Sequence, residues 1–475
     1  MGRLFAYNAN GEKIQIGEQL DWRVSLNGPG GTVQLGQSSC NSLGVGKREA
    51  LFIHSALVLA RQISFSFPPM LRIQAFQGLR PALSLVSEVA CVPYDVVDRE
   101  ESAALAAGKP HSLLHVDRAE IDLPADTDPY SDAVYAKARE NFLALQADGA
   151  LVRETGPCVY LYQQRMGGHV QVGIAAVCHI EDYERDIIKK HEKTRRDKED
   201  DRTRLIGTLS ADTGPVFLTY RDSEAIDALV AAAQKDAPLY DFTAPDGIQH
   251  TVWRVAGGES FVEKFRDVPV AYVADGHHRT ASAVRVGRER REKNPSHTGN
   301  EDYNWFLAVL FPASQLQILP YNRAVKDLNG LTTAEFLDAA GRAFTVKPNA
   351  GDTPACPGEI RMYLDGAWHG LTWQPAVDAD PISQLDVTGL QDRLLAPILG
   401  IDDPRTSKRI DFIGGIRGPG ELVKAVDSGK SAVAFSMYPT TVEQLMAIAD
   451  ANQIMPPKST WFEPKLRSGL FIHTF

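Results

Sequence analysis

The chain has 475 residues, of which 44% are hydrophobic and 23% are charged, and its formal net charge is -10. At about 150 residues per domain this length predicts two or three domains, and the apolar fraction excludes disorder as the main state of the chain. The acidic balance argues against a general nucleic-acid-binding protein, because phosphate contacts need a basic surface.

The five cysteines are scattered, and no two are spaced as in a zinc cluster or a disulfide framework. No apolar run approaches the roughly 20 residues that cross a bilayer. The longest candidate, residues 50–67, is interrupted by His54, Arg61 and Gln62. We therefore predict a cytoplasmic protein with reduced thiols and no membrane partner.

Residues 1–69 differ in composition from the remainder of the chain. Gly, Asn, Ser and Gln dominate residues 8–46, and a segment that looks like an ordinary protein start opens at Met70. Three interpretations remain: an upstream stretch translated from a mis-assigned start, a poorly ordered extension, or a targeting segment. The apolar part lies far from the N-terminus and no small-residue cleavage site follows it, which argues against targeting. We expect the folded protein to begin near Met70.

From Met70 onward, β-branched apolar runs that predict strands alternate with the periodic patterns of helices. The predicted helices cover 99–107, 130–148, 223–234, 280–293, 333–344 and 384–399. The predicted strands cover 159–162, 170–177, 216–220 and 268–274, with a hairpin of 359–364 and 368–373. This order predicts a mixed α/β (α+β) fold, with one region over 70–295 and a second over 296–475.

The most informative segment runs from the strand ending at Asp275, through Gly276, to a helix predicted from Thr280. Free amides and the positive end of the helix dipole meet at such a turn, which favours anions. Glycine lets the backbone approach a ligand closely. His277, His278 and Arg279 add donors suited to phosphoryl oxygens, and Thr280 could cap the helix or contact a phosphate or its metal ion.

Two other interpretations of this turn stay open. It could be a plain helix cap with exposed histidines, or His277 and His278 could hold a metal ion, although adjacent residues diverge on a helix. The segment lacks the GxxxxGK[ST] loop and the GxGxxG fingerprint, which excludes a Walker-type or Rossmann-type phosphate site.

A second charged run covers residues 187–202. It begins like the HExxH motif of zinc proteases at His191 and Glu192, but Arg195 stands where the second histidine is needed. One interpretation is a solvated helix with i,i+4 ion pairs, Lys193 with Asp197 and Arg195 with Glu199. The other is an acid and base cluster in which Glu192 serves as a base and Arg195 or Arg202 contacts a phosphate.

Two shorter signals remain. Asp95 follows the strand-like residues 89–92, where a site can lie, but the position is more typical of a turn near the start of the helix predicted over 99–107. Residues 455–465 combine lysines, hydroxyls and aromatic side chains between prolines, including Lys458 and Ser459. A stiff loop of this composition could close over a ligand or be purely structural.

Five motifs occur in one order along the chain: 93–96 (Pro-Tyr-Asp-Val), 191–194 (His-Glu-Lys-Thr), 275–279 (Asp-Gly-His-His-Arg), 385–387 (Leu-Asp-Val) and 455–462 (Met-Pro-Pro-Lys-Ser-Thr-Trp-Phe). Together they resemble the bacterial and archaeal "domain of unknown function" family 1015 over residues 70–475. One departure from that pattern is Asn322, where relatives often carry histidine. The stretch before Met70 has no counterpart in the pattern.

The motif 275–279 is also similar to the phosphate-contacting motif of the ParB/sulfiredoxin superfamily, which includes free L-serine kinases. That similarity implies a ParB/sulfiredoxin-like nucleotide-binding core and phosphate transfer from ATP or ADP to a small hydroxyl metabolite, with serine as the expected acceptor. It implies that residues 276–280 bind the nucleotide. Mg²⁺ would be held partly by Asp275 or Asp95.

In the mechanism that this resemblance suggests, Glu192 accepts the proton of the acceptor hydroxyl and Arg195 or Lys458 stabilises the transferred group. The substrate-binding residues would be Asp95, His191, Arg202, Lys458 and Ser459. A nucleotide-binding regulator without catalysis and a phosphohydrolase remain as alternatives. The expected partner is a small molecule rather than nucleic acid, and the sequence leaves the oligomeric state open.

Overall fold

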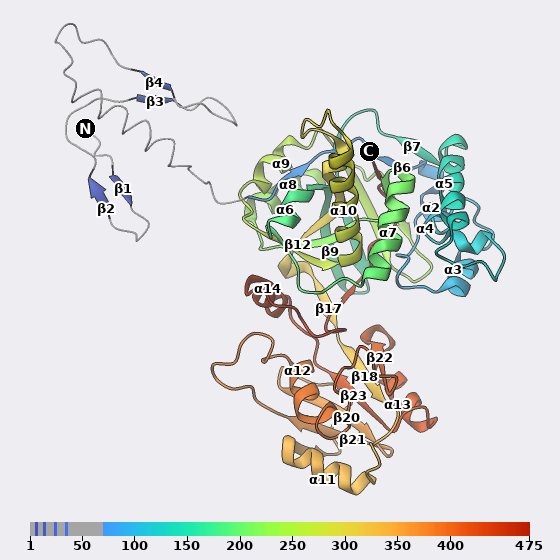
Figure 1. The fold of residues 1–475 in the computed structure, drawn as a ribbon, viewed down its shortest axis with the longest axis vertical. Helices are drawn as coiled ribbons and strands as arrows, with labels where there is room; N and C mark the ends of the chain where they lie inside the picture. The colour runs from blue at the N-terminus through green and yellow to red at the C-terminus, as the bar shows by residue number, and fades with distance from the viewer. Residues whose placement is uncertain (1–4, 8–12, 16–22, 26–33, 37–69) are drawn as a thin grey trace. The chain divides into compact units, whose positions relative to one another are not determined.

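The computed structural model describes residues 5–7, 13–15, 23–25, 34–36 and 70–475 (Figure 1). The chain separates into two compact units, Met1–Ser66 and Phe67–Phe475. In the first unit, β1 (Phe5–Tyr7) pairs antiparallel with β2 (Lys13–Gln15), and β3 (Arg23–Ser25) pairs with β4 (Gln34–Gly36). The interpretations of residues 1–69 concern a stretch that lies mostly outside the described residues. Among the described helices, none has the length and apolar character that crossing a membrane requires.

A mixed nine-stranded sheet forms the centre of the second unit. Its order is β10 (Ile188–Lys189), β15 (Ala271–Asp275), β12 (Val216–Tyr220), β16 (Trp305–Pro312), β9 (His169–His179), β8 (Cys158–Met166), β14 (Gln249–Ala256) and β13 (Tyr240–Thr243), while β5 (Ile73–Gln74) pairs with β9. The central strands are buried along almost their whole length. This burial explains why their sequences read as continuous apolar runs rather than as an alternation of apolar and polar residues.

Successive side chains of these strands enter two separate cores. In β16, Leu307 and Val309 belong to one hydrophobic cluster, whereas Phe306 and Ala308 belong to the other. Such an alternation follows from the two-residue period of a strand, whose side chains point to opposite faces of the sheet. Both faces of the sheet are therefore covered.

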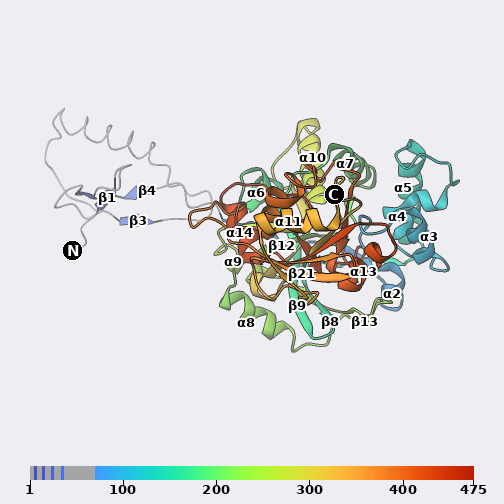
Figure 2. The ribbon, with the colours of Figure 1, turned by 90° about the horizontal axis from the view of Figure 1, so that it is seen from below.

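Helices cover the sheet and build a third core beside it. The helices α7 (Arg196–Leu209) and α10 (His277–Lys293) pack against each other (Figure 1). A separate cluster contains α3 (Arg99–Ala106), α4 (Leu114–Asp117) and α5 (Asp132–Ala147), which lie together in both views (Figures 1 and 2). The remaining helices of this region are α2 (Val86–Val89), α6 (Ile180–Glu184), α8 (Glu224–Ala233) and α9 (Glu259–Phe265).

A second, six-stranded sheet follows in the chain. Its order is β19 (Thr345–Pro348), β21 (Ala367–Thr372), β20 (Glu359–Leu364), β23 (Val433–Met437), β18 (Tyr321–Val325) and β22 (Ile410–Gly414). The helices in this part of the chain are α11 (Thr333–Ala343), α12 (Asp386–Leu390), α13 (Pro419–Asp427) and α14 (Val442–Asp450). The boundary suggested near residue 295 stays a prediction, and β16, which comes after it, belongs to the first sheet.

Short strand pairs tie distant segments together. β17 (Gln317–Leu319) pairs with β24 (Trp461–Glu463), and β11 (Ala211–Asp212) pairs with β25 (His473–Thr474). A third pair joins β6 (Leu79–Pro81) to β7 (Leu151–Arg153). The first two pairs, together with the hydrogen bond that Gln164 of β8 donates to the carbonyl oxygen of Lys465, bring the segment 461–475 back beside the first sheet.

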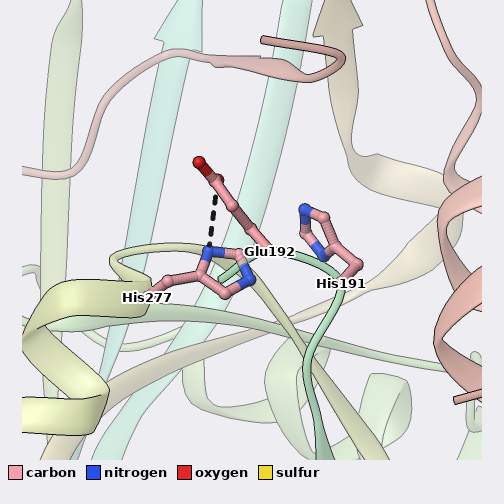
Figure 3. Close-up of side chains that lie close together, drawn as sticks. All are labelled: His191, Glu192 and His277. Carbon is pink, nitrogen blue, oxygen red and sulfur yellow. Dashed lines mark ion pairs between the residues drawn. The ribbon is translucent and has the colours of Figure 1, made fainter. Parts of the chain in front are cut away.

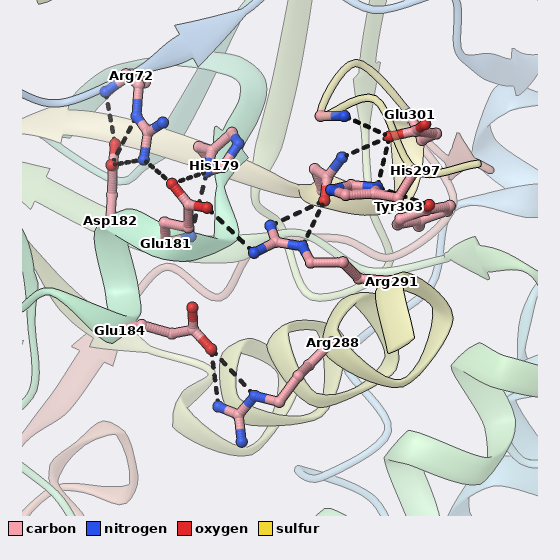
Figure 4. Close-up of polar contacts among 12 residues, drawn as sticks. Arg72, His179, Glu181, Asp182, Glu184, Arg288, Arg291, His297, Glu301 and Tyr303 are labelled. Atoms are coloured by element: carbon pink, nitrogen blue, oxygen red, sulfur yellow. Dashed lines mark hydrogen bonds and ion pairs between the residues drawn. The ribbon is translucent and has the colours of Figure 1, made fainter. Parts of the chain in front are cut away.

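Ion pairs fix α10 against α6 and the neighbouring chain (Figure 4). Arg288 lies 2.8 Å from Glu184, and Arg291 lies 3.1 Å from Glu181. Arg291 also donates to the side-chain oxygen of Asn304 at 2.9 Å. These contacts hold the C-terminal half of α10 against α6.

The predicted mixed α/β fold is confirmed, but two predicted elements differ. The helix expected from Thr280 begins at His277. Residues 187–202 do not form one helix, because the run starts with β10 and α7 begins only at Arg196. Arg195 has an extended backbone and pairs with Asp197 at 2.8 Å, so the predicted pair of Arg195 with Glu199 was wrong. Within α7, Arg196 and Asp200 form an exposed i,i+4 pair at 3.9 Å.

Candidate functional site

Two neighbouring strands bring the polar residues of the two charged motifs together. β10 and β15 are parallel, with Ile188 opposite Ala271 and Lys189 opposite Tyr272. The carboxyl ends of parallel strands meet at the same edge of a sheet. The residues that follow β10, His191 and Glu192, therefore lie beside the end of β15 and the turn after it. The sequence offered both motifs but no sign of this pairing.

The turn after β15 has the geometry expected of an anion site. Gly276 has φ 91° and ψ 31°, in the left-handed region, and it is the N-cap of α10 without any side-chain capping bond. Helix geometry leaves the first backbone amides of α10 without carbonyl partners. The first backbone hydrogen bond of this turn is donated by the amide of Thr280 to the carbonyl oxygen of Gly276, at 2.9 Å. The amides of His277, His278 and Arg279 and the helix dipole thus favour negative charge.

Thr280 lies inside the first turn of α10. Its hydroxyl donates to the carbonyl oxygen of Gly276 at 3.0 Å, and the side chain is fully buried. The helix is capped by Gly276, so the predicted capping role of Thr280 was wrong. The hydroxyl is engaged by the backbone of its own turn.

Asp275 lies between two cations. Its carboxylate oxygen is 3.4 Å from the guanidinium of Arg279 and 3.6 Å from the ammonium of Lys465. Burial acts to raise the pKa of Asp275, but Lys465 and Arg279 outweigh it and the pKa is lowered. Asp275 is therefore ionised at neutral pH, and its charge is offset by Arg279 and Lys465.

Arg279 is buried and connects the turn to two other segments. Its NH1 donates to the carbonyl oxygen of Pro215, and its NH2 lies 4.0 Å from Asp95. Its Nε has no hydrogen-bond partner among the described residues. The structure thus brings the exposed Asp95 to the turn, as a neighbour of the arginine rather than of Gly276.

The imidazoles of His191 and His277 lie against each other beside Glu192 (Figure 3). The ring centroids are 4.5 Å apart at 89°, and Nδ1 of His277 is 3.7 Å from Oε2 of Glu192. Burial lowers the pKa of His191 to about 4, and burial together with His191 lowers the pKa of His277 well below its ordinary value. Both rings are therefore uncharged at neutral pH.

Glu192 lies at the exposed side of this cluster. Its side chain is 48% exposed, yet protein atoms displace enough water to raise its pKa, against the opposing influence of Lys458 and Lys465. A carboxylate with a raised pKa is better matched to accepting a proton from a hydroxyl. His278 faces elsewhere, because its Nε2 accepts the backbone amide of Arg195 at 3.0 Å.

Other predicted site residues make contacts of their own. Arg202 is buried over the ring of Tyr94 at 4.0 Å and pairs with Asp201 at 2.9 Å. The side chain of Arg195 is 72% exposed and bound to Asp197. The hydroxyl of Ser459 donates to the carbonyl oxygen of Pro456 at 2.7 Å, within the same loop.

Lys458 is exposed, and its ammonium lies 5.3 Å from the centre of the Tyr321 ring. Asn322, the position where the sequence departs from the family pattern, lies in β18. Its side-chain oxygen accepts a hydrogen bond from the Met437 amide at 3.0 Å, which is a structural contact.

Lys465 is the functional candidate that sequence reasoning did not single out. It follows β24, and the segment before it is anchored where the Met455 amide donates to the carbonyl oxygen of His191 at 2.8 Å. The basic and aromatic composition of residues 455–465 was the sequence feature that could have indicated Lys465. Only the pairing of β24 with β17 shows which lysine of that segment reaches Asp275.

The residues present do not form a site suited to Mg²⁺. Asp275 is already matched by two cations, and Asp95 lies beside Arg279. Within residues 70–475, the side chains that bring three potential ligand atoms within 4.8 Å of one another are His191, Glu192 and His277. Mg²⁺ prefers oxygen ligands, whereas two of these three donors are imidazole nitrogens.

Comparisons with known proteins give a family but no activity. No curated protein matches the chain. A free serine kinase in complex with AMP is 12% identical, with 63% of this chain and 91% of that chain covered and a TM-score of 0.32.

Truncated SbnI from Staphylococcus aureus is 10% identical, with 61% and 82% covered and a TM-score of 0.32. A conserved hypothetical protein from Pyrococcus furiosus is 11% identical, with 63% and 95% covered and a TM-score of 0.31. The model of the family described as "Protein of unknown function (DUF1015)" matches residues 73–388, more than half of the sequence, and the chain belongs to this family.

Proposed function

We propose that this protein is a phosphotransferase that moves a phosphoryl group from ATP or ADP to the hydroxyl of a small metabolite, with free L-serine as the expected acceptor. The observation that carries the proposal is the turn between β15 and α10. There, Gly276 in the left-handed region starts a helix whose first amides are free, and two cations, Arg279 and Lys465, lie beside it. Such a turn suits the phosphates of a nucleotide.

The transfer step needs few groups from the protein. The acceptor oxygen forms a bond to the terminal phosphorus while the bond from that phosphorus to the bridging oxygen breaks, and the shortened nucleotide leaves. The proton of the acceptor hydroxyl passes to the carboxylate of Glu192, whose raised pKa supports this role. Phosphoryl transfer depends mainly on positioning and on neutralising charge.

The charges at the turn support stabilisation of the transferred group. The amides of α10 and the guanidinium of Arg279 are fixed by the fold before a ligand arrives, since Arg279 is buried and bound to the carbonyl oxygen of Pro215. Donors that are already oriented stabilise developing charge without reorganisation. No part of this step is assigned to Mg²⁺.

The test is an assay of purified full-length protein with ATP or ADP, divalent cations and a panel of amino acids, with phosphorylated products detected by mass spectrometry. We expect phosphoserine, and we expect Glu192→Gln to lower its rate of formation by about 10²–10³ while nucleotide still binds. Glu443→Gln, at an exposed position of α14, is the control and keeps the wild-type rate.

Each alternative outcome points to a different function. Release of inorganic phosphate that does not depend on the amino acid would indicate a phosphohydrolase. Nucleotide binding without turnover would indicate a regulator. Failure of every nucleotide to bind would overturn the assignment of the turn.

A further inference from the structure

The cluster of His191, Glu192 and His277 has the composition of a metal site (Figure 3). Each side chain offers one ligand atom, and these atoms all lie within 4.8 Å of one another. We infer that these three residues bind a divalent transition-metal ion such as Zn²⁺ or Mn²⁺. The inference goes beyond the proposed phosphotransfer, because an ion would bind here whether or not a phosphoryl group is transferred.

The two histidines lack the partners that buried polar groups require. His191 is 2% exposed and His277 is 4% exposed. Within the described part of the chain, the ring of His191 approaches the backbone of Val273, but neither of its nitrogens forms a hydrogen bond of good geometry, and Nε2 of His277 has no partner. Buried polar atoms are almost always paired, and an unpaired one destabilises the fold. A bound cation would supply the missing partner for a nitrogen of each ring.

The three side chains of the cluster do not form hydrogen bonds with one another. The rings of His191 and His277 are perpendicular, at 89°, and meet edge to face rather than through a hydrogen bond. The 3.7 Å between His277 Nδ1 and Glu192 Oε2 is longer than a hydrogen bond. Packing of the two imidazole rings against each other does not pair their nitrogens. The carboxylate of Glu192 lies at the exposed side of the cluster, where an ion can arrive from solvent.

The donor set indicates the class of metal. Two imidazoles and one carboxylate form the ligand set of several catalytic zinc sites, in which the remaining position is taken by water or substrate. Imidazole also suits other first-row transition metals, whereas Mg²⁺ and Ca²⁺ select oxygen ligands. A zinc–nitrogen distance of about 2.0–2.1 Å puts neighbouring ligand atoms roughly 3.4 Å apart, so the present spacing needs only a modest closure.

The backbone places the two histidines independently of any ion. His191 follows β10 and His277 opens α10 after β15, and the parallel pairing of β10 with β15 fixes their separation. The half-exposed Glu192 is the ligand that can move. A carboxylate can bind an ion through one oxygen and keep the other for a proton, so this role is compatible with the proposed base.

The test uses full-length protein that has been stripped with a chelator and dialysed against Zn²⁺, Mn²⁺ or Co²⁺ alone. We expect one tightly bound ion per chain for at least one of these metals, and ligand-field absorption in the visible range for bound Co²⁺. His191→Ala and His277→Ala should each weaken binding by at least about 100-fold, since even the loss of residues behind a metal ligand costs 10–100-fold.

His278→Ala is the matched control. His278 is adjacent to His277 in the same turn, but its Nε2 is bound to the Arg195 amide, so its removal should leave metal affinity within about twofold of the wild type. If a buried-histidine variant does not fold, Glu192→Ala, at a half-exposed side chain, takes its place and should lower affinity for the same metal.

Equal affinities of His277→Ala and His278→Ala, or no retained ion for any of the three metals, would overturn the inference. Nucleotide binding is measured on the same samples. Metal binding without phosphotransfer would support the metal site and contradict the proposed function. Phosphotransfer with no metal at these residues would support the proposed function and contradict the metal site.

Discussion

The ammonium of Lys465 lies 3.6 Å from the carboxylate of Asp275, and this contact joins the segment after β24 to the end of β15. Arg279 approaches the same carboxylate from the other side at 3.4 Å. One negative charge is thus shared by two positive ones. Lys465 thus brings a positive charge to the turn at Gly276 from a distant part of the sequence, and this charge supports the binding of an anion there.

Lys465→Met should weaken nucleotide binding by about tenfold or more. The substitution removes a charge beside the turn, and hydrogen bonds or close contacts to charged groups contribute roughly 1.5–3 kcal/mol, where 1.4 kcal/mol corresponds to tenfold. Calorimetric titration with ATP and ADP measures the change in Kd. Lys424→Met, at a side chain that is 78% exposed, is the control, and equal affinities of the two variants would contradict the role of Lys465.

Gly276→Ala should destabilise the fold by about 1–2 kcal/mol, because φ at this position is 91° and left-handed backbone is unfavourable for residues with a Cβ. The added Cβ would also meet Nε of Arg279 at 3.1 Å. Urea denaturation measures the loss. Gly207→Ala in α7, where a Cβ has nothing within 4 Å, should instead stabilise the protein by about 0.5–1 kcal/mol.

Arg279→Lys should lower the free energy of unfolding by about 1–3 kcal/mol although it keeps the charge. The guanidinium reaches Pro215, Asp275 and Asp95 at once, and a single ammonium cannot reproduce this geometry. Arg285→Lys on the same helix is the control, because that side chain is 40% exposed and its ion pairs contribute at most about 1 kcal/mol. Similar losses for the two variants would indicate that the contacts of Arg279 add no stability.

His250→Gln should make the fold less sensitive to acid. Burial, aided by Arg467, lowers the pKa of His250 from 6.5 to about 3. Between these values the unfolded chain binds a proton that the folded chain does not. The free energy of unfolding therefore falls as the pH falls through this window, by up to about 1.4 kcal/mol per pH unit.

The variant removes this contribution, so the slope of unfolding free energy against pH should be smaller between pH 6.5 and pH 3. Denaturation at a series of pH values measures the slope, and only slopes are compared, because the loss of the Tyr162 hydrogen bond at 2.7 Å also lowers stability at every pH. Parallel slopes would show that His250 gains its proton in the folded state at an ordinary pKa.

Much of the fold followed from local patterns. The predicted helices at 130–148 and 333–344 correspond to α5 and α11, and the apolar periodicity is strong in α11. The hairpin of β20 and β21 turns at Asp365 and Gly366, as this residue pair predicts. Strands β9 and β12 were recognisable as apolar runs because both faces of the sheet are covered.

The elements that assemble the site were harder to predict. β10 has two residues, too few for a pattern, and it exists because β15 offers it a parallel edge. The charge pattern of residues 187–202 is compatible with a helix. Its first residues are instead held in extended structure by the pairing with β15 and by the hydrogen bond from the Met455 amide to the His191 carbonyl oxygen. The sequence could name Asp275, Gly276 and Arg279, whereas the neighbours of His277 depend on tertiary contacts.

The return of residues 461–475 to the first sheet has a consequence for synthesis of the protein. Every strand of that sheet is translated before Lys465, which completes the polar edge beside Asp275. A nascent chain can therefore bury its central strands while it still lacks a cation needed at the turn. Under the proposed function, a nucleotide would meet the complete set of charges beside Asp275 only after the segment around β24 has left the ribosome.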